Sequence, residues 1–343
     1  MKIILVAMGG DHAPEAVVLG ALDAAKDFKT EIILVGRGED ILAAMKKNGV
    51  NDLPEGVAIA NADDVVDMHD DPAAVLHKRK NSSMVVGLKM LAEGAGDAFV
   101  SAGSTGALLT AATLVVKRVK GIRRAAMAPA FPNKTGGKTI ICDCGANAEC
   151  TPEFLLQFAI VGSLHAKKSL GLENPRVGLL NIGTEDSKGT ALQLAVYPML
   201  QQAHEQGLIN FIGNVEARQV PMGEVDVVVC DGFSGNVLLK SIEGTAMFLG
   251  SSVSAMFKKN FVSKLAAMLV MKDIKAFKKL LDYREIGGTQ FLGIKKPVIK
   301  AHGSSDARAF YNAVRQAVDA ANNNTAEELE AALKQISVAK EKA

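Results

Sequence analysis

The sequence has little aromatic character and almost no net charge. It has no tryptophan and three tyrosines in 343 residues, and 39 basic residues against 37 acidic ones give a net charge of +2. A chain whose main task is to neutralise nucleic-acid phosphates carries a clear basic excess, and single-strand binders stack bases on aromatic side chains. We therefore expect no nucleic-acid partner, and any charged partner has to meet a local patch.

Cysteines and long apolar runs are also scarce. Four cysteines without a secretory signal indicate reduced thiols in a cytoplasmic protein, packed as small apolar residues. The first apolar run ends at Met8 and is too short for a secretory segment. The uncharged stretch from Ala98 to Val116 approaches the roughly 20 residues of a membrane helix, but the loop-forming residues 101–106 interrupt it. We expect no membrane span.

Short apolar runs rich in Val and Ile alternate with longer segments of helical period. This order predicts repeated strand–helix–strand units and a mostly parallel sheet. Several runs are apolar at consecutive positions, as in strands that helices cover on both faces. The predicted strands are residues 3–7, 31–35, 98–101, 139–142, 177–182, 210–212, 225–230 and 297–301.

Six of these runs end in a polar loop that contains glycine and leads into a helical pattern. In an open parallel sheet such loops lie at one edge, where ligands bind. Glycine lets backbone N–H groups approach a ligand, and a helix N-terminus favours an anion, so the edge suits phosphate. The alternative is that the glycines only make tight turns. The loops are residues 8–12, 101–106, 143–147, 181–185, 231–236 and 301–305.

Residues 1–321 are interpreted as one continuous domain with a basic elaboration at residues 256–281. Apolar spacing there predicts two amphipathic helices that meet near Met271 and Lys272. Such a segment suits a membrane surface or an acidic partner, and the alternative is a pair of helices that packs subunits together. Its lysines face one acid, Asp273, and are Lys258, Lys259, Lys264, Lys272, Lys275, Lys278 and Lys279.

Residues 322–343 are expected to form a polar linker and an exposed terminal helix. Thr325 is the predicted N-cap, and Glu328 takes the second position of a capping box.

Several motifs of other enzyme classes are missing. After the second predicted strand, Gly36 and Gly38 start a nicotinamide-type pattern, but Ile41 replaces its third glycine. The Gly-Lys-Thr at 137–139 lacks the first glycine of a phosphate-binding P-loop, and Ser234 lacks the spacing of a nucleophile elbow. The cysteines lack the paired spacing of a zinc site, so no metal is expected.

The loops also carry a family resemblance. Residues 8–14, 80–89, 101–107, 143–147, 178–185, 231–237 and 301–305 hold motifs in the order found in bacterial phosphate acyltransferases, which the chain resembles over about residues 1–320. Two positions depart from the family pattern, because Val6 stands where the family usually has Asp and Ser104 where it usually has Asn.

The resemblance implies a homodimer with a three-layer α/β/α sandwich around a mostly parallel, Rossmann-like sheet. It implies transfer of a fatty acyl group from acyl carrier protein to inorganic phosphate, giving acyl phosphate for phospholipid synthesis. It further implies no cofactor, peripheral attachment to the membrane surface, and a downstream glycerol-phosphate acyltransferase as a partner.

This reaction needs no covalent nucleophile. Inorganic phosphate is already an anion near neutrality, and a thiol of pKa about 8.5 is a good leaving group. The protein has to orient phosphate and supply donors to the developing oxyanion.

Four residues are the catalytic candidates. Lys188 would hold phosphate or stabilise the oxyanion, and Asn236 would donate to the thioester carbonyl. Asp11 and His12 would orient phosphate or pass a proton to the leaving thiol. The alternatives are a solvated lysine at a helix end, an N-cap, and a loop histidine bonded to a main-chain carbonyl.

The remaining candidates would bind phosphate, with helix capping as the alternative for Ser104 and Thr105 and a structural role as the alternative for the weaker choices Asn147, Asp231 and His302. They are Gly9, Gly10, Gly103, Ser104, Thr105, Gly106, Asn147, Gly183, Thr184, Asp231 and His302. Two other functions stay open at this point: a dehydrogenase of the isopropylmalate type, because related folds bind nicotinamide, and a non-enzymatic scaffold for lipid-synthesis proteins.

Overall fold

Twelve strands form two mostly parallel sheets in the computed structural model, which describes residues 1–274, 283–323 and 325–341. The predicted α/β class is confirmed, but the strands divide between two sheets where one was expected. The larger has the order β3-β2-β1-β4-β12-β11-β5, and the smaller β6-β7-β10-β8-β9. The strands are β1 Lys2–Val6, β2 Glu31–Gly36, β3 Val57–Asn61, β4 Ala98–Ser101, β5 Ala126–Ala128, β6 Ala130–Pro132, β7 Lys138–Cys142, β8 Arg176–Asn181, β9 Asn210–Glu216, β10 Val227–Val229, β11 Gly288–Leu292 and β12 Val298–Ala301.

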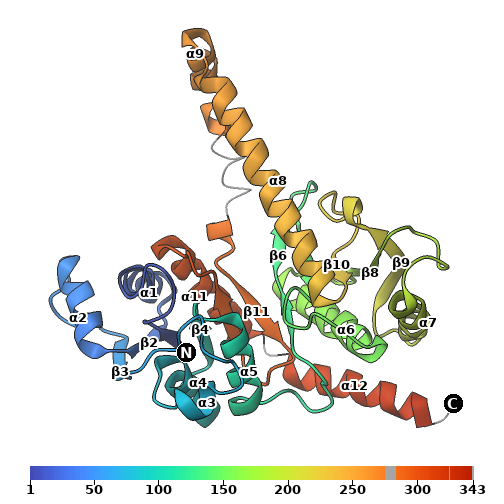
Figure 1. Ribbon diagram of the computed structural model, residues 1–343, viewed down its shortest axis with the longest axis horizontal. Helices are drawn as coiled ribbons and strands as arrows, with labels where there is room; N and C mark the ends of the chain where they lie inside the picture. Colours follow the sequence, from blue (N-terminus) through green and yellow to red (C-terminus); the bar gives the residue numbers. More distant parts are fainter. Residues whose placement is uncertain (275–282, 324, 342–343) are drawn as a thin grey trace.

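Helices cover both faces of each sheet (Figure 1). On the larger sheet, α1, α2 and α11 pack on one face and α4 and α5 on the other. On the smaller sheet, α6, α7 and α12 pack on one face and the first turns of α8 on the other. The helices are α1 Glu15–Phe28, α2 Gly38–Lys47, α3 Val75–Lys78, α4 Ser83–Glu93, α5 Thr105–Val115, α6 Pro152–Ser169, α7 Ala191–Glu205, α8 Gly232–Lys258, α9 Phe261–Leu269, α11 Ala307–Asn322 and α12 Ala326–Glu341, with 3-10 turns at Ala217–Gln219 and Tyr283–Glu285.

All eight predicted strands are present, and four further strands were missed. The missed strands lack the run of consecutive branched apolar residues that marks a buried parallel strand. β5 and β6 have three residues each, β3 is half-buried, and β11 begins with a glycine and two polar residues. β6 and β11 are also antiparallel to their neighbours, so their sequences do not have to be apolar on both faces.

The chain passes from one sheet to the other within residues 126–132. β5 is the edge strand of the larger sheet, β6 is the edge strand of the smaller one, and only Pro129 separates them. The carbonyl oxygens of Met127 and Pro129 accept hydrogen bonds from the N–H groups of Cys144 and Ile141 at 2.9 and 3.0 Å. These main-chain bonds tie the end of β7 to both segments and hold the sheets together.

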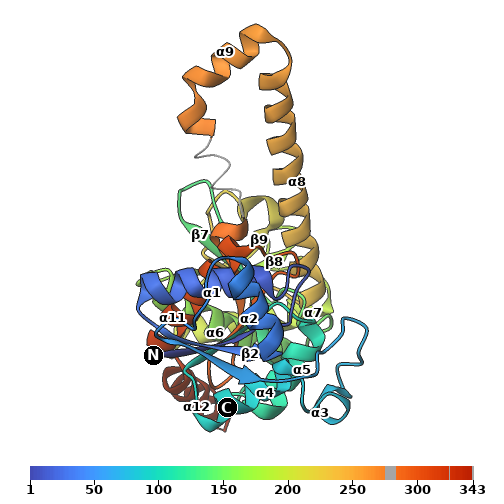
Figure 2. The ribbon, with the colours of Figure 1, turned by 90° about the vertical axis from the view of Figure 1, so that its left-hand side faces the viewer.

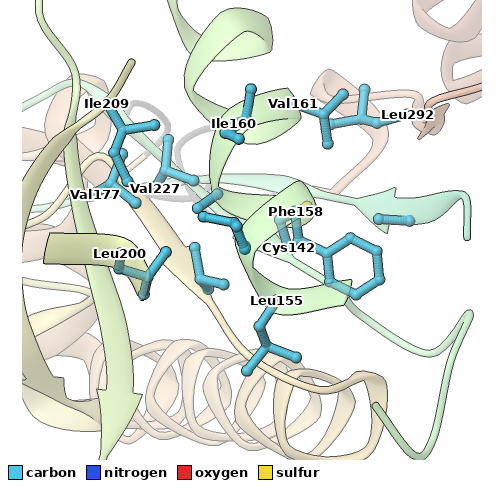
Figure 3. Packing of buried hydrophobic residues seen from close by; sticks show 14 of the residues in the cluster. Cys142, Leu155, Phe158, Ile160, Val161, Val177, Leu200, Ile209, Val227 and Leu292 are labelled. Atoms are coloured by element: carbon cyan, nitrogen blue, oxygen red, sulfur yellow. The ribbon is translucent and has the colours of Figure 1, made fainter. Parts of the chain in front are cut away.

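The core of the smaller sheet is built mostly from aliphatic residues, with Phe158 packed among them (Figure 3). Phe158 and Leu155 of α6 are fully buried against the strand residues Val177 and Val227. Cys142 is buried in the same cluster and, like the other three cysteines, forms no disulfide. Cys144 and Cys230 are buried as well, which confirms that these cysteines pack as small apolar residues, whereas Cys150 is half-buried.

Helix α8 leaves the body of the protein and carries α9 at its far end (Figure 2). The predicted boundaries of the helix pair differ from the observed ones. The long helix begins at Gly232, well before residue 256, and the break between the helices at Lys259 and Asn260 was not predicted. Asn260 caps α9 by accepting from the Ser263 N–H group at 2.8 Å. The predicted break near 271 is close, since α9 ends before Val270 and residues 271–274 are again helical. Lys275, Lys278 and Lys279 lie outside the described residues.

The C-terminal helix is less exposed than expected. Leu329 and Leu333 of α12 are buried in the core cluster of α6, and Glu328 pairs with Lys168 of α6 at 2.7 Å. A purely polar tail has no reason to pack in this way, whereas two leucines four residues apart form one apolar stripe. Of the helices in the described ranges, none is both long and apolar enough to pass through a membrane.

His165 of α6 predicts an acid-sensitive step in stability. Burial lowers the pKa of its imidazole from 6.5 to about 4, so the unfolded chain binds more protons between these values. The free energy of unfolding then falls as the pH drops from 6.5 towards 4, by about 2 kcal/mol at pH 5. The variant His165→Gln lacks this contribution. Its free energy of unfolding, measured with urea at pH 7.5 and pH 5, should therefore fall less between the two pH values than that of the wild type. Parallel losses in both proteins would contradict the prediction.

Candidate functional site

All six predicted glycine loops follow a strand and lead into a helix. They connect β1 to α1, β4 to α5, β7 to α6, β8 to α7, β10 to α8, and β12 to α11. Three of them end strands of the larger sheet and three end strands of the smaller one. The loops were expected to lie at one edge of a single sheet, but they lie at the edges, or rims, of two sheets. The site therefore depends on how these two rims meet.

The three loops of the larger sheet pack directly against one another. A Cβ atom at Gly9 would lie 2.9 Å from the backbone nitrogen of Gly103, and one at Gly10 would lie 2.9 Å from the carbonyl oxygen of Gly303. Gly10 also has a φ of +99°. The N–H group of Asp11 donates to the Gly303 carbonyl at 2.8 Å. These glycines bring the loops together, and the exposed side chains of Asp11 and His12 lie at their surface.

The start of α5 is arranged differently from the expected anion cradle. The N–H group of Gly103 donates to the Ser101 hydroxyl at 3.1 Å, so a ligand does not receive it. Ser104 holds the N-cap position but makes no side-chain capping bond, which contradicts the capping alternative for its hydroxyl. Thr105 and Gly106 are the first helical residues, and their N–H groups have no partner within the helix.

Asp143 organises the loops of the smaller sheet. Its side chain is fully buried and accepts hydrogen bonds from the N–H groups of Met127, Cys144 and Asn147 at 2.6–2.8 Å. The Asn147 side-chain amide adds a bond at 3.0 Å and donates to the Ala125 carbonyl. Burial raises the pKa of the Asp143 carboxyl, while these donors favour its ionised form. The side chain of Asn147 thus takes the structural role that was the alternative to phosphate binding.

The first turn of α8 fits tightly against Asp143. A Cβ atom at Gly232 would lie 2.8 Å from an Asp143 carboxylate oxygen, and one at Gly235 would lie 2.0 Å from the Asp143 carbonyl oxygen. Asp231 is the N-cap of α8, since its carboxylate accepts from the Ser234 N–H and hydroxyl groups at 2.8 Å. Asn236 was predicted to lie in a turn, and this is wrong, because the residue lies within the first turns of α8.

His302, in a loop of the larger sheet, lies near the start of α8, which follows a strand of the smaller sheet. Asn236 is exposed and lies beside Gly145, where an added Cβ would be 3.9 Å from its side-chain carbon. Burial, and then the charges of Lys240 on α8 and of Lys300 on β12, lower the pKa of the His302 imidazole. His302 and the first turns of α8 are thus close enough to interact, although they follow strands of different sheets. The His302 Nδ1 atom contacts the Ser304 hydroxyl at 2.8 Å.

The loop after β8 is bonded to the neighbouring strand β9. Its carbonyl at Glu185 accepts from the Asn214 side chain of β9 at 2.7 Å. Lys188 does not begin a helix, because α7 starts at Ala191 behind the N-cap Thr190. The lysine lies in the preceding turn, with its aliphatic chain over Gly183, and its side chain is exposed like that of Thr184.

Two residues of this region were missed as candidates. Asp143 lies in the predicted loop 143–147, directly after a buried strand. Only the three-dimensional packing shows how many N–H groups donate hydrogen bonds to its carboxylate. Lys300 is a lysine inside an apolar strand that ends in a glycine loop, and that placement is a signal in the sequence. Its ammonium group donates to the carbonyl oxygens of Ala102, at 3.3 Å, and Ala301.

Comparison with known proteins identifies the family. A family model described as a fatty acid synthesis protein matches residues 1–328. The chain is 44% identical over 336 residues to the phosphate acyltransferase of Bacillus licheniformis. The aligned region covers 98% of this chain and 99% of that protein. The chain belongs to the phosphate acyltransferase family. As a member, it is an acyltransferase enzyme of fatty acid and lipid synthesis.

Solved structures share the fold of this phosphate acyltransferase family member at low identity. A phosphotransacetylase from Streptococcus pyogenes matches 96% of this chain and 94% of its own, with a TM-score of 0.60 and 20% identity. A 4-hydroxythreonine-4-phosphate dehydrogenase from Klebsiella pneumoniae matches 93% and 99%, with a TM-score of 0.53 and 13% identity. Since transferases and dehydrogenases share the fold, the fold does not decide the reaction.

The packing of α8 on Asp143 gives a stability prediction with an internal control. In Gly235→Ala the methyl group meets a main-chain oxygen that cannot move away, so we expect a loss of about 3 kcal/mol or more in the free energy of unfolding. Gly244→Ala in the same helix meets nothing within 4 Å and should stabilise by about 0.5–1 kcal/mol. Denaturant unfolding measures both, and equal effects of the two variants would contradict the packing described.

Proposed function

We propose that the protein transfers a fatty acyl group from the thioester of acyl carrier protein to inorganic phosphate and releases acyl phosphate. The observation that carries the proposal is the meeting of glycine loops from both sheets around the start of α8, next to basic side chains of β12 and α8. An extended site of this kind can hold a small anion beside a larger acyl donor. Membership of the phosphate acyltransferase family supports phosphate as the acceptor.

The chemistry needs two bond changes at one carbon atom. A phosphate oxygen attacks the thioester carbonyl, the carbon–sulfur bond breaks, and the thiolate leaves with the electron pair and takes a proton. Because phosphate dianion is the nucleophile, no side chain has to be acylated. The protein contributes by holding the two substrates in line and by donating hydrogen bonds to the carbonyl oxygen as charge develops there.

The proposed roles follow from where the side chains lie. The exposed amide of Asn236, beside Gly145, donates to the thioester carbonyl. Asp11 and His12, on the loop that packs against Gly303, orient phosphate or carry the proton to the thiolate. Lys188 holds phosphate or the oxyanion from the loop after β8. The N–H groups of Thr105 and Gly106 remain candidates for phosphate, whereas that of Gly103 does not.

We further propose that the projecting end of α8 with α9 attaches the protein to partners. Three lysines there, Lys258, Lys259 and Lys264, are exposed and suit the acidic carrier protein or anionic lipid. Exposed apolar side chains of α9 suit the membrane surface or a second subunit of a homodimer. They are Phe261, Val262, Leu265, Met268 and Leu269.

The catalytic proposal predicts the effect of two truncations. Lys188→Ala and Asn236→Ala should each lower kcat/KM for acyl phosphate formation by about 100-fold or more, the usual cost of removing one donor to an oxyanion. The assay traps acyl phosphate as hydroxamate from acyl carrier protein thioester and phosphate. Lys46→Ala on α2 is the control. Unchanged rates in both variants would contradict these two roles. A wild type that forms no acyl phosphate would support a scaffold, and binding of NAD to the protein would support a dehydrogenase.

The attachment proposal predicts separable effects of charge and apolar surface. Reversing Lys258, Lys259 and Lys264 to Glu should raise the KM for acyl carrier thioester about tenfold or abolish sedimentation with anionic vesicles, since each lysine near such a surface contributes about 1 kcal/mol. Phe261→Ser with Leu269→Ser should reduce binding to neutral vesicles as well. The control reverses three exposed lysines elsewhere, Lys46, Lys120 and Lys134. No change in either property would exclude a role for the lysines.

A further inference from the structure

Lys300 is the charged residue that the proposed function leaves without a task. It stands in β12, whose other residues, Val298, Ile299 and Ala301, are apolar and buried. Its side chain is half-buried, and in the described ranges no carboxylate pairs with its ammonium group. A cation taken out of water without a partner costs free energy, so the position calls for a compensating anion.

The ammonium group lies where the three loops of the larger sheet meet. One of its hydrogen-bond acceptors is the carbonyl of Ala102, the residue before Gly103, and the other is the carbonyl of Ala301, the residue before His302. A Cβ atom at Gly10 would lie 3.2 Å from the Ala102 side chain. Lys300 therefore contacts the loops after β4 and β12 from within the sheet, the loop after β1 packs against the same Ala102, and the charge of Lys300 acts on His302.

Two carbonyl oxygens do not complete the surroundings of this group. An ammonium group has three donors, and neutral oxygens leave its net charge in place. Burial lowers the pKa of Lys300 to about 8, with no acidic side chain contributing in the opposite direction. A bound dianion would stabilise the charged ammonium group and raise this pKa again.

We propose that Lys300 is a phosphate-binding residue of this acyltransferase and holds the dianion against the loops after β1, β4 and β12 for attack on the thioester. The inference rests on the proposed function and adds a residue to its site. Lys300 donates its remaining N–H to a phosphate oxygen, while its bonds to Ala102 and Ala301 fix the side chain. The first-turn N–H groups of α5, which follow Ala102 in the chain, contribute to the same anion.

The chain contains a matched control in Lys296. It is also half-buried, and its ammonium group likewise donates to two main-chain carbonyl oxygens, those of Leu91 at 2.9 Å and Gly96 at 3.4 Å. It precedes β12, at the opposite end of the strand from the glycine loops. A merely structural lysine should respond to substitution as Lys296 does.

The test compares Lys300→Met, Lys300→Arg and Lys296→Met. Lys300→Met keeps the length of the side chain and removes its charge, so the KM for phosphate should rise about 50-fold or more, as for loss of a charge-assisted contact. The KM for acyl carrier thioester should stay within about threefold. Lys300→Arg keeps the charge and should recover part of the phosphate affinity, and Lys296→Met should leave both KM values unchanged.

A second measurement separates this inference from the proposed function. Inorganic phosphate alone should raise the thermal midpoint of the wild type and of Lys296→Met, but not of Lys300→Met. If the wild type forms no acyl phosphate, the proposed function fails, and loss of phosphate protection in Lys300→Met still supports the phosphate site. If acyl phosphate forms and Lys300→Met keeps the wild-type KM and protection, Lys300 does not bind phosphate. Should Lys300→Met not fold, Lys300→Gln is measured in its place under the same criteria.

Discussion

The buried carboxylate of Asp143 holds the two halves of the protein in register. It stands at the end of β7 in the smaller sheet and accepts a hydrogen bond from Met127 in β5 of the larger sheet. The first turn of α8 packs on the same residue, with glycines at 232 and 235 because no larger residue fits. Together with the main-chain bonds from Cys144 and Ile141, this contact fixes the relation of the two rims, and the residues proposed to act on one substrate pair come from both rims.

A site divided between two sheets suits the proposed reaction. Asp11, His12 and Lys300 belong to the larger sheet, and Lys188 and Asn236 to the smaller one. A small anion held by the first set and a thioester carbonyl held by the second would meet across the start of α8. The arrangement requires orientation more than reactive side chains, which agrees with a nucleophile that is already charged near neutrality.

The sequence predicted the parts of the fold that depend on local pattern. Buried strands such as β1 and β10 are marked by consecutive Val and Ile residues, and each glycine loop was placed correctly between a strand and a helix. The division into two sheets was not predictable, because it depends on the short segment 126–132, whose Ala-Met-Ala and Ala-Phe-Pro runs have no strand-like length. The end of α8 was not predictable for a similar reason. The helical spacing of apolar residues continues on both sides of Asn260, and only the N-cap at that residue separates α8 from α9.

The roles of single side chains were harder to predict than the loops that hold them. Asn147 and Asp231 are polar residues in glycine loops, as ligands would be, yet one bonds to Asp143 and the other caps α8. Lys300 was overlooked because its position in a strand does not show that its side chain bonds to the loops after β4 and β12. The most direct test of the account is phosphorus NMR of the wild type with acyl carrier protein thioester and phosphate. The account predicts one acyl phosphate for each thiol released, whereas thiol release without acyl phosphate, or no release, would contradict it.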